Sequence, residues 1–181
     1  MTGEAYELDP VQAITASAVG EPGHRVFYLQ ARTQEATVTL VAEKAQVVVL
    51  AHGIYQLLAE IGDKYPATNQ SAGGGPLDME LHAPLEPDFR VERLELGYDP
   101  QRDLVVLVAY ELIPEEPDAA GQPLPDAPSM ARFYATRDQM RALADHALEV
   151  AAEGRPVCAL CGQPQDPEGH VCPRRNGHPP G

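Results

Sequence analysis

The stretch TVTLVAEKAQVVVLAHGIYQLLAEIG, residues 37–62, decides the fold because a strand pattern leads directly into a helix pattern. Its opening residues, TVTLVA, are mostly β-branched or apolar, as is typical of a strand. The apolar residues that follow recur at spacings of three, four and seven, which places them on one face of a helix: Val47, Leu50, Ala51, Ile54, Leu57 and Leu58. We therefore expect a strand at 37–42 and a helix over 44–61 that ends at Gly62.

The same pattern returns 93 positions later in ARFYATRDQMRALADHALEVAAEG, residues 131–154. Its apolar residues match those of the first helix one by one: Met140, Leu143, Ala144, Ala147, Val150 and Ala151. Gln46 corresponds to Gln139, and each follows a residue at a helix-capping position, Glu43 in the first copy and Thr136 in the second. We interpret the chain as an internal duplication.

Two further strands are expected before each strand and helix. In the first half, AITASAV and RVFYLQA flank the turn GEPG at 20–23, where proline and glycine favour a tight reversal. In the second half, FRVERLELGY and DLVVLVAYEL flank a turn at Asp99 and Pro100. Each repeat is thus strand, strand, strand, helix. Together they predict an α+β fold with a mostly antiparallel sheet of six strands and both helices on one face.

The expected body covers residues 1–154, with the first repeat at 11–62, a linker rich in glycine and proline at 63–87, and the second repeat at 88–154. The prolines of an insertion at 114–129 are incompatible with a helix or a central strand. The strand at 104–109 is apolar at every position, so we expect cover on both of its faces. The helices would cover one face, and the linker, a ligand or a second copy in a homodimer would cover the other.

Charge and composition restrict the partners. The chain of 181 residues has a formal net charge of −14, and residues 1–154 alone carry −15, so we expect the body to repel nucleic acid. Arginines cluster only in the tail, at Arg155, Arg174 and Arg175. The acidic start MTGEAYELDP is unlike a secretion signal, and no apolar run is longer than 47–51, so we expect a cytoplasmic protein with no membrane span.

Residues 155–181 have a different composition, with too few apolar side chains to fold by burial. They contain a C-x-x-C pair followed by Gly162, and then a histidine and a cysteine two positions apart. Three sulfurs and one imidazole form a closed tetrahedral shell for a structural zinc ion, with the ligands Cys158, Cys161, His170 and Cys172. His178 is the rival fourth ligand. Three unrelated thiols are the alternative to a metal site.

The sequence resembles an uncharacterised actinobacterial family that is classed as a domain of unknown function, in the 3090 series. The resemblance runs through VGEPG at 19–23, FYLQA at 27–31, EKAQV at 43–47, FRV at 89–91 and, in the tail, CALCG with DPEGHVCPRRNG. This family has no established activity. What the resemblance implies is therefore limited to the domain boundaries and to zinc ligands in the tail.

The leading functional prediction is a non-catalytic binding or adaptor protein whose zinc knuckle docks on a protein partner or on the body. The sequence contains no phosphate-binding glycine loop, no G-x-S-x-G and no H-E-x-x-H, so no motif indicates an enzyme. The alternative is a small-molecule binder or enzyme that uses a polar group in the first repeat: Glu21, His24, Arg25, Glu43 and Lys44. A deep pocket that gathers these residues would favour the alternative.

Overall fold

The computed structural model describes residues 3–66, 77–114, 127–154, 158–162, 165, 172 and 174. The chain begins with one strand, which is followed by two units of three strands and a helix each. They are β1 (Ala5–Leu8), β2 (Ala13–Val19), β3 (Val26–Arg32), β4 (Thr37–Ala42), α1 (Lys44–Lys64), β5 (Phe89–Asp99), β6 (Leu104–Glu111), β7 (Met130–Ala135) and α2 (Arg137–Ala152).

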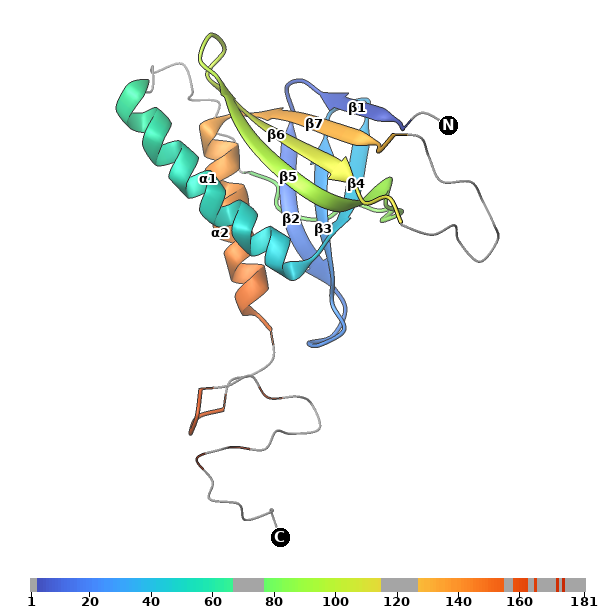
Figure 1. Ribbon diagram of the computed structural model, residues 1–181, viewed down its shortest axis with the longest axis vertical. Helices are drawn as coiled ribbons and strands as arrows, with labels where there is room; N and C mark the ends of the chain where they lie inside the picture. Colours follow the sequence, from blue (N-terminus) through green and yellow to red (C-terminus); the bar gives the residue numbers. More distant parts are fainter. Residues whose placement is uncertain are drawn as a thin grey trace, which may run out of the picture.

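The strands form one mixed sheet of seven strands in the order β1-β7-β6-β5-β4-β3-β2. The chain is antiparallel within β2–β3–β4 and within β5–β6–β7, whereas β4 and β5 pair in parallel through only two residue pairs. This short junction lets the sheet bend. In Figure 1 the strands β2, β3 and β4 run across the direction of β5, β6 and β7. The α+β class is confirmed.

The prediction of six strands is wrong, because β1 adds a seventh. It pairs in parallel with β7, and beyond it the amide of Val11 donates to the carbonyl of Tyr134 at 2.8 Å before the chain enters β2. The two ends of the curved sheet therefore meet at this corner. The four residues AYEL show no strand pattern of their own, since their pairing depends on β7, which lies more than a hundred positions away in the sequence.

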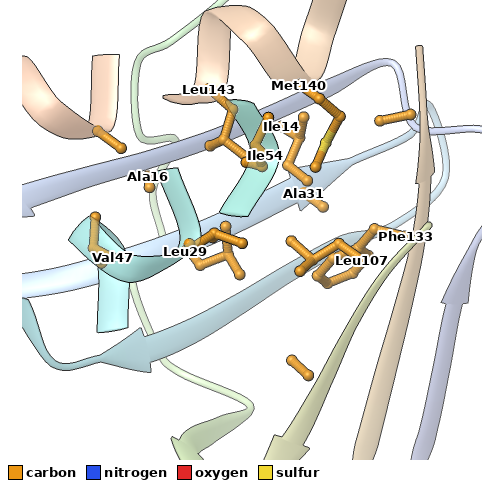
Figure 2. Packing of buried hydrophobic residues seen from close by; sticks show 14 of the residues in the cluster. Ile14, Ala16, Leu29, Ala31, Val47, Ile54, Leu107, Phe133, Met140 and Leu143 are labelled. Carbon is orange, nitrogen blue, oxygen red and sulfur yellow. The ribbon is translucent and has the colours of Figure 1, made fainter. Parts of the chain in front are cut away.

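Both helices pack side by side on one face of the sheet (Figure 1). Figure 2 shows the core between the layers, where Ile54 of α1 and Leu143 of α2 meet Ile14 and Leu29 of the sheet. By length and composition α1 could cross a membrane, a property that core helices of globular proteins share. Its apolar face is buried here, at Val47, Leu50, Ala51, Ile54, Leu58 and Ile61.

The expected end of the first helix at Gly62 is wrong. Helix α1 continues through this glycine to Lys64, and the amide of Tyr65 donates to the carbonyl of Ile61 at 2.7 Å. A glycine inside a helix costs about 1 kcal/mol relative to alanine. Burial of Ile61, which is 4 % exposed, offsets that cost.

A glutamine at the start of each helix ties that helix to the sheet. The Gln46 side chain accepts from the amide of Glu43 and donates to the carbonyls of Val91 and Glu92. The Gln139 side chain accepts from the amide of Thr136 and donates to the carbonyls of Val11 and Gln12. The glutamines therefore place α1 against the start of β5 and α2 against the chain that enters β2.

The described end of the linker, residues 77–87, and Asp88 after it lie along the outer face of β2, β3 and β4. Thr15 Oγ1 donates to the carbonyl of Met79 at 2.7 Å, and Gln30 Nε2 donates to the carbonyl of His82 at 2.9 Å. The hydrogen bonds of these described residues reach these three strands rather than β6, whose Val106 and Val108 are half-buried.

Candidate metal centre and binding pockets

The three cysteines come together in the tail. Their Sγ atoms all lie within 4.8 Å of one another, and the Sγ atoms of Cys158 and Cys172 are 3.8 Å apart. Tetrahedral zinc with Zn–S bonds of about 2.3 Å separates its sulfur ligands by about 3.8 Å. The separation of Cys158 and Cys172 therefore matches that of two ligands in such a shell, and the Sγ of Cys161 lies within 4.8 Å of both.

A tight turn positions the first two thiols. Gly162 adopts a φ of 71°, which favours glycine, and its amide donates to the carbonyl of Cys158 at 2.8 Å. Backbone hydrogen bonds from Cys161 and Leu160 lower the pKa of the Cys158 thiol to about 6, and burial opposes this shift. A lowered pKa favours the thiolate of Cys158, which is the form that binds metal.

The fourth ligand is still a prediction. Both His170 and His178 lie outside the described residues. Near the cluster, Arg174 donates to the carbonyl of Leu160 at 3.1 Å, which ties the chain after Cys172 to the C-x-x-C turn. The described residues therefore support a site with three sulfur ligands for a metal ion.

A first pocket lies in the body where the β2–β3 hairpin, the start of α1 and the end of α2 meet (Figure 1). Its volume is about 580 Å³, and three cationic side chains line it: Arg25, Lys44 and Arg90. The guanidinium of Arg25 donates to the carbonyl of Val150 at 3.0 Å, at the end of α2. This side chain is only 12 % exposed, so it is held in place.

The other charged groups of the first pocket differ in their pairing. Arg25 also approaches the carboxylate of Glu153 at 3.5 Å, and Arg90 pairs with Glu43. Lys44 makes no hydrogen bond and no ion pair with any residue that the structure describes. Among the described residues, the ammonium of Lys44 is therefore the cation of this pocket that has no counter-charge.

The first pocket gathers only part of the polar group expected from the sequence. Arg25, Glu43 and Lys44 line it, whereas Glu21 and His24 lie exposed on the hairpin and do not. Sequence reasoning missed Arg90. This residue reaches the pocket because β5 begins in parallel beside the end of β4, where Arg90 pairs with Val41, and no local pattern predicts that pairing.

A second pocket of about 580 Å³ lies at the other end of the helices, between the β5–β6 hairpin, the start of α2 and the end of α1 (Figure 1). Arg137 is one of its lining residues. This guanidinium donates to Asp103 at 2.6 Å, and to the Tyr98 hydroxyl and the Tyr65 carbonyl at 2.8 Å each. Tyr98 in turn donates to Asp103 at 2.7 Å, so the polar groups here bind one another.

Strand register relates the two pockets residue by residue. Phe27 pairs with Ala42 as Val105 pairs with Ala135. Arg25 lies two positions before Phe27, and Asp103 lies two positions before Val105, so Arg25 corresponds to Asp103. Lys44 lies two positions after Ala42, and Arg137 lies two positions after Ala135, so Lys44 corresponds to Arg137. An ion pair in the second pocket is thus replaced by two cations in the first.

Comparison with known proteins identifies the family. A family model described as a protein of unknown function (DUF3090) matches residues 6–172, a range that includes the body and all three cysteines. No curated protein matches the chain. No solved structure matches it either. Since the family model covers nearly the whole sequence, the chain belongs to the DUF3090 family.

Proposed function

We propose that the protein is a zinc-binding, non-catalytic adaptor, in which a rigid α+β body carries a tail that the metal orders for contact with a protein partner. The convergence of Cys158, Cys161 and Cys172, with Sγ atoms within 4.8 Å of one another, is the observation that carries this proposal. Thiolate ligands in a tetrahedral arrangement suit zinc, and a fourth ligand, His170, would close the shell to water. A closed shell favours a structural role.

The energy of metal binding supports a tail that depends on zinc. Binding at structural sites contributes roughly 10 to 16 kcal/mol in small peptides, far more than the few apolar residues of 155–181 can supply. The turn leaves Leu160 54 % exposed. An exposed leucine on a metal-ordered turn is a suitable contact for an apolar recess on a protein partner.

We further propose that the body, residues 1–154, arose by duplication of one strand-strand-strand-helix unit, with 155–181 as a separate tail. The similar hydrogen bonds of Gln46 and Gln139 support this origin, because Gln46 joins α1 to the first strand of the second unit and Gln139 joins α2 to the chain that enters the first strand of the first unit. Such reciprocal packing is what a pseudo-twofold axis between the two units would produce.

Metal analysis tests the zinc proposal. We expect one zinc ion per chain in protein purified without chelators, and none in the double variant Cys158→Ser/Cys161→Ser. Limited trypsin digestion should leave Arg174 intact in the zinc-loaded protein and cleave it in the variant, while both proteins show the same melting temperature for the body. Comparison of His170→Ala with His178→Ala identifies the fourth ligand, since only one of them should lower zinc affinity.

A partner assay tests the adaptor role separately. Proteins captured by the zinc-loaded chain should be lost from the double variant and from the variant Leu160→Ser, which retains the ligands. Metal-free wild-type protein, or capture that does not change on loss of zinc, would contradict the proposal.

A further inference from the structure

We propose that the first pocket binds a small organic phosphate, with Lys44 and Arg25 on the phosphate group and the apolar wall on the organic group. This site is separate from the cysteine cluster. Its volume of about 580 Å³ is within the range of pockets that enclose small molecules.

The charges in the first pocket carry the inference. Three lining residues are cationic and one, Glu43, is anionic. With Glu153, which pairs with Arg25, the local charge is +1 in a body whose net charge is −15. Neighbouring like charges repel each other, and a bound anion removes that repulsion. In the second pocket Asp103 plays this part for Arg137. In the first pocket Glu153 pairs with Arg25 and Glu43 pairs with Arg90, so Lys44 is the cation that has no counter-charge among the described residues.

The two cations are suited to different tasks. Arg25 is fixed by the Val150 carbonyl and by Phe27, whose ring centroid lies 5.6 Å from the guanidinium carbon. Lys44 lies close to the end of α2, because a Cβ on Gly154 would lie 3.2 Å from its Nζ. A rigid guanidinium and an ammonium without a partner among the described residues, both beside the end of α2, can bind one anion together.

The class of ligand follows from charge and lining. A phosphate monoester presents three strong acceptor oxygens and carries about −1.5 to −2 charges at neutral pH, so it offers Arg25 and Lys44 more acceptors and more charge than a single carboxylate does. The remaining wall is apolar, with Val26, Phe27, Val41 and Ala151, and it would cover an apolar or aromatic group. Inorganic phosphate would leave that wall exposed to water, so an organic phosphate is the better match.

Calorimetric titration of the full-length, zinc-loaded protein with phenyl phosphate tests this site. We expect saturable binding that the variant Lys44→Gln weakens about tenfold, which is the loss of roughly one charge-assisted hydrogen bond. Lys44→Arg should retain affinity to within about threefold, because it keeps the charge. The matched control is Lys64→Gln, which removes the same charge from the second pocket and should change affinity less than about twofold.

Two further probes separate the phosphate from the rest of the ligand. Benzoate should bind more weakly than phenyl phosphate, and benzyl alcohol should show no saturable binding. The inference is overturned if phenyl phosphate gives no saturable heat, if Lys44→Gln and Lys64→Gln weaken binding equally, or if benzyl alcohol binds as well as phenyl phosphate. Loss of binding in Lys44→Gln with the zinc content unchanged would show that this site acts independently of the tail.

Discussion

The first and second pockets have equal volumes of about 580 Å³, are built from corresponding hairpins and helix ends, and are each lined by three cations and one carboxylate, yet the cation at the matched position is paired differently. In the second pocket Arg137 is satisfied by Asp103, Tyr98 and Tyr65. In the first pocket Lys44, in the position of Arg137, has no partner among the described residues. The comparison teaches that corresponding pockets of one fold can differ in role: the polar groups of the second pocket stabilise the protein by binding one another, whereas we propose that those of the first pocket bind a ligand.

The largest expected effect distinguishes these two roles directly. Arg137→Gln should lower the free energy of unfolding by about 1 to 3 kcal/mol, because it removes the charged partner of the partly buried carboxylate of Asp103. The corresponding change Lys44→Gln should alter that free energy by less than about 0.5 kcal/mol, since an exposed and unpaired side chain is removed. Urea denaturation of both variants measures the difference. Equal destabilisation by the two substitutions would contradict the assignment.

A charge reversal should have a smaller effect of opposite sign. Lys44→Glu should raise the free energy of unfolding by about 0.5 kcal/mol, because it places an anion near Arg25 and Arg90 and adds the first acidic residue to the first turn of α1. The same substitution should abolish phenyl phosphate binding. Arg137→Glu is the matched change in the second pocket, and it should be destabilising because it places two carboxylates together. Thermal melts without ligand compare the two variants, and a fall in both melting temperatures would go against the account.

The smallest expected effect is on the titration of Tyr98. Burial and the hydrogen bond that it donates to Asp103 raise the pKa of Tyr98 above its ordinary value of 10.0. Because the folded-state pKa is the higher one, this contribution to stability is complete below pH 10 and is lost as the pH rises through the raised value. Asp103→Asn should bring the pKa of Tyr98 down, as seen by the carbon chemical shifts of labelled tyrosine between about pH 9 and 12. An unchanged titration would mean that Asp103 does not control this phenol.

Local patterns in the sequence were sufficient for much of the fold. The spacing of apolar residues predicted both helix faces, and the pairing of Gln46 with Gln139 identified the two helix starts. These features depend on contacts between residues that are close in sequence. The C-x-x-C pair followed by glycine was informative for the same reason, since its turn geometry is local.

Features that depend on distant pairing could not be predicted. Strand β1 exists because β7 is available as a partner, and Arg90 enters the first pocket because β5 starts beside β4. The correspondence of Arg25 with Asp103 was hidden as well. Lys44 and Arg137 are 93 positions apart, whereas Arg25 and Asp103 are only 78 apart, because the connections within the two units differ in length. Only the strand register aligns them.

The most direct test of the contrast between the two pockets is a nuclear magnetic resonance titration of the isotope-labelled full chain with phenyl phosphate. We expect saturable shifts at the amides of Arg25, Lys44 and Gly154, at the first pocket, and none at Asp103 or Arg137, at the second. Shifts of equal size at both pockets, or none at the first, would contradict the claim that the first pocket alone is open to an anionic ligand.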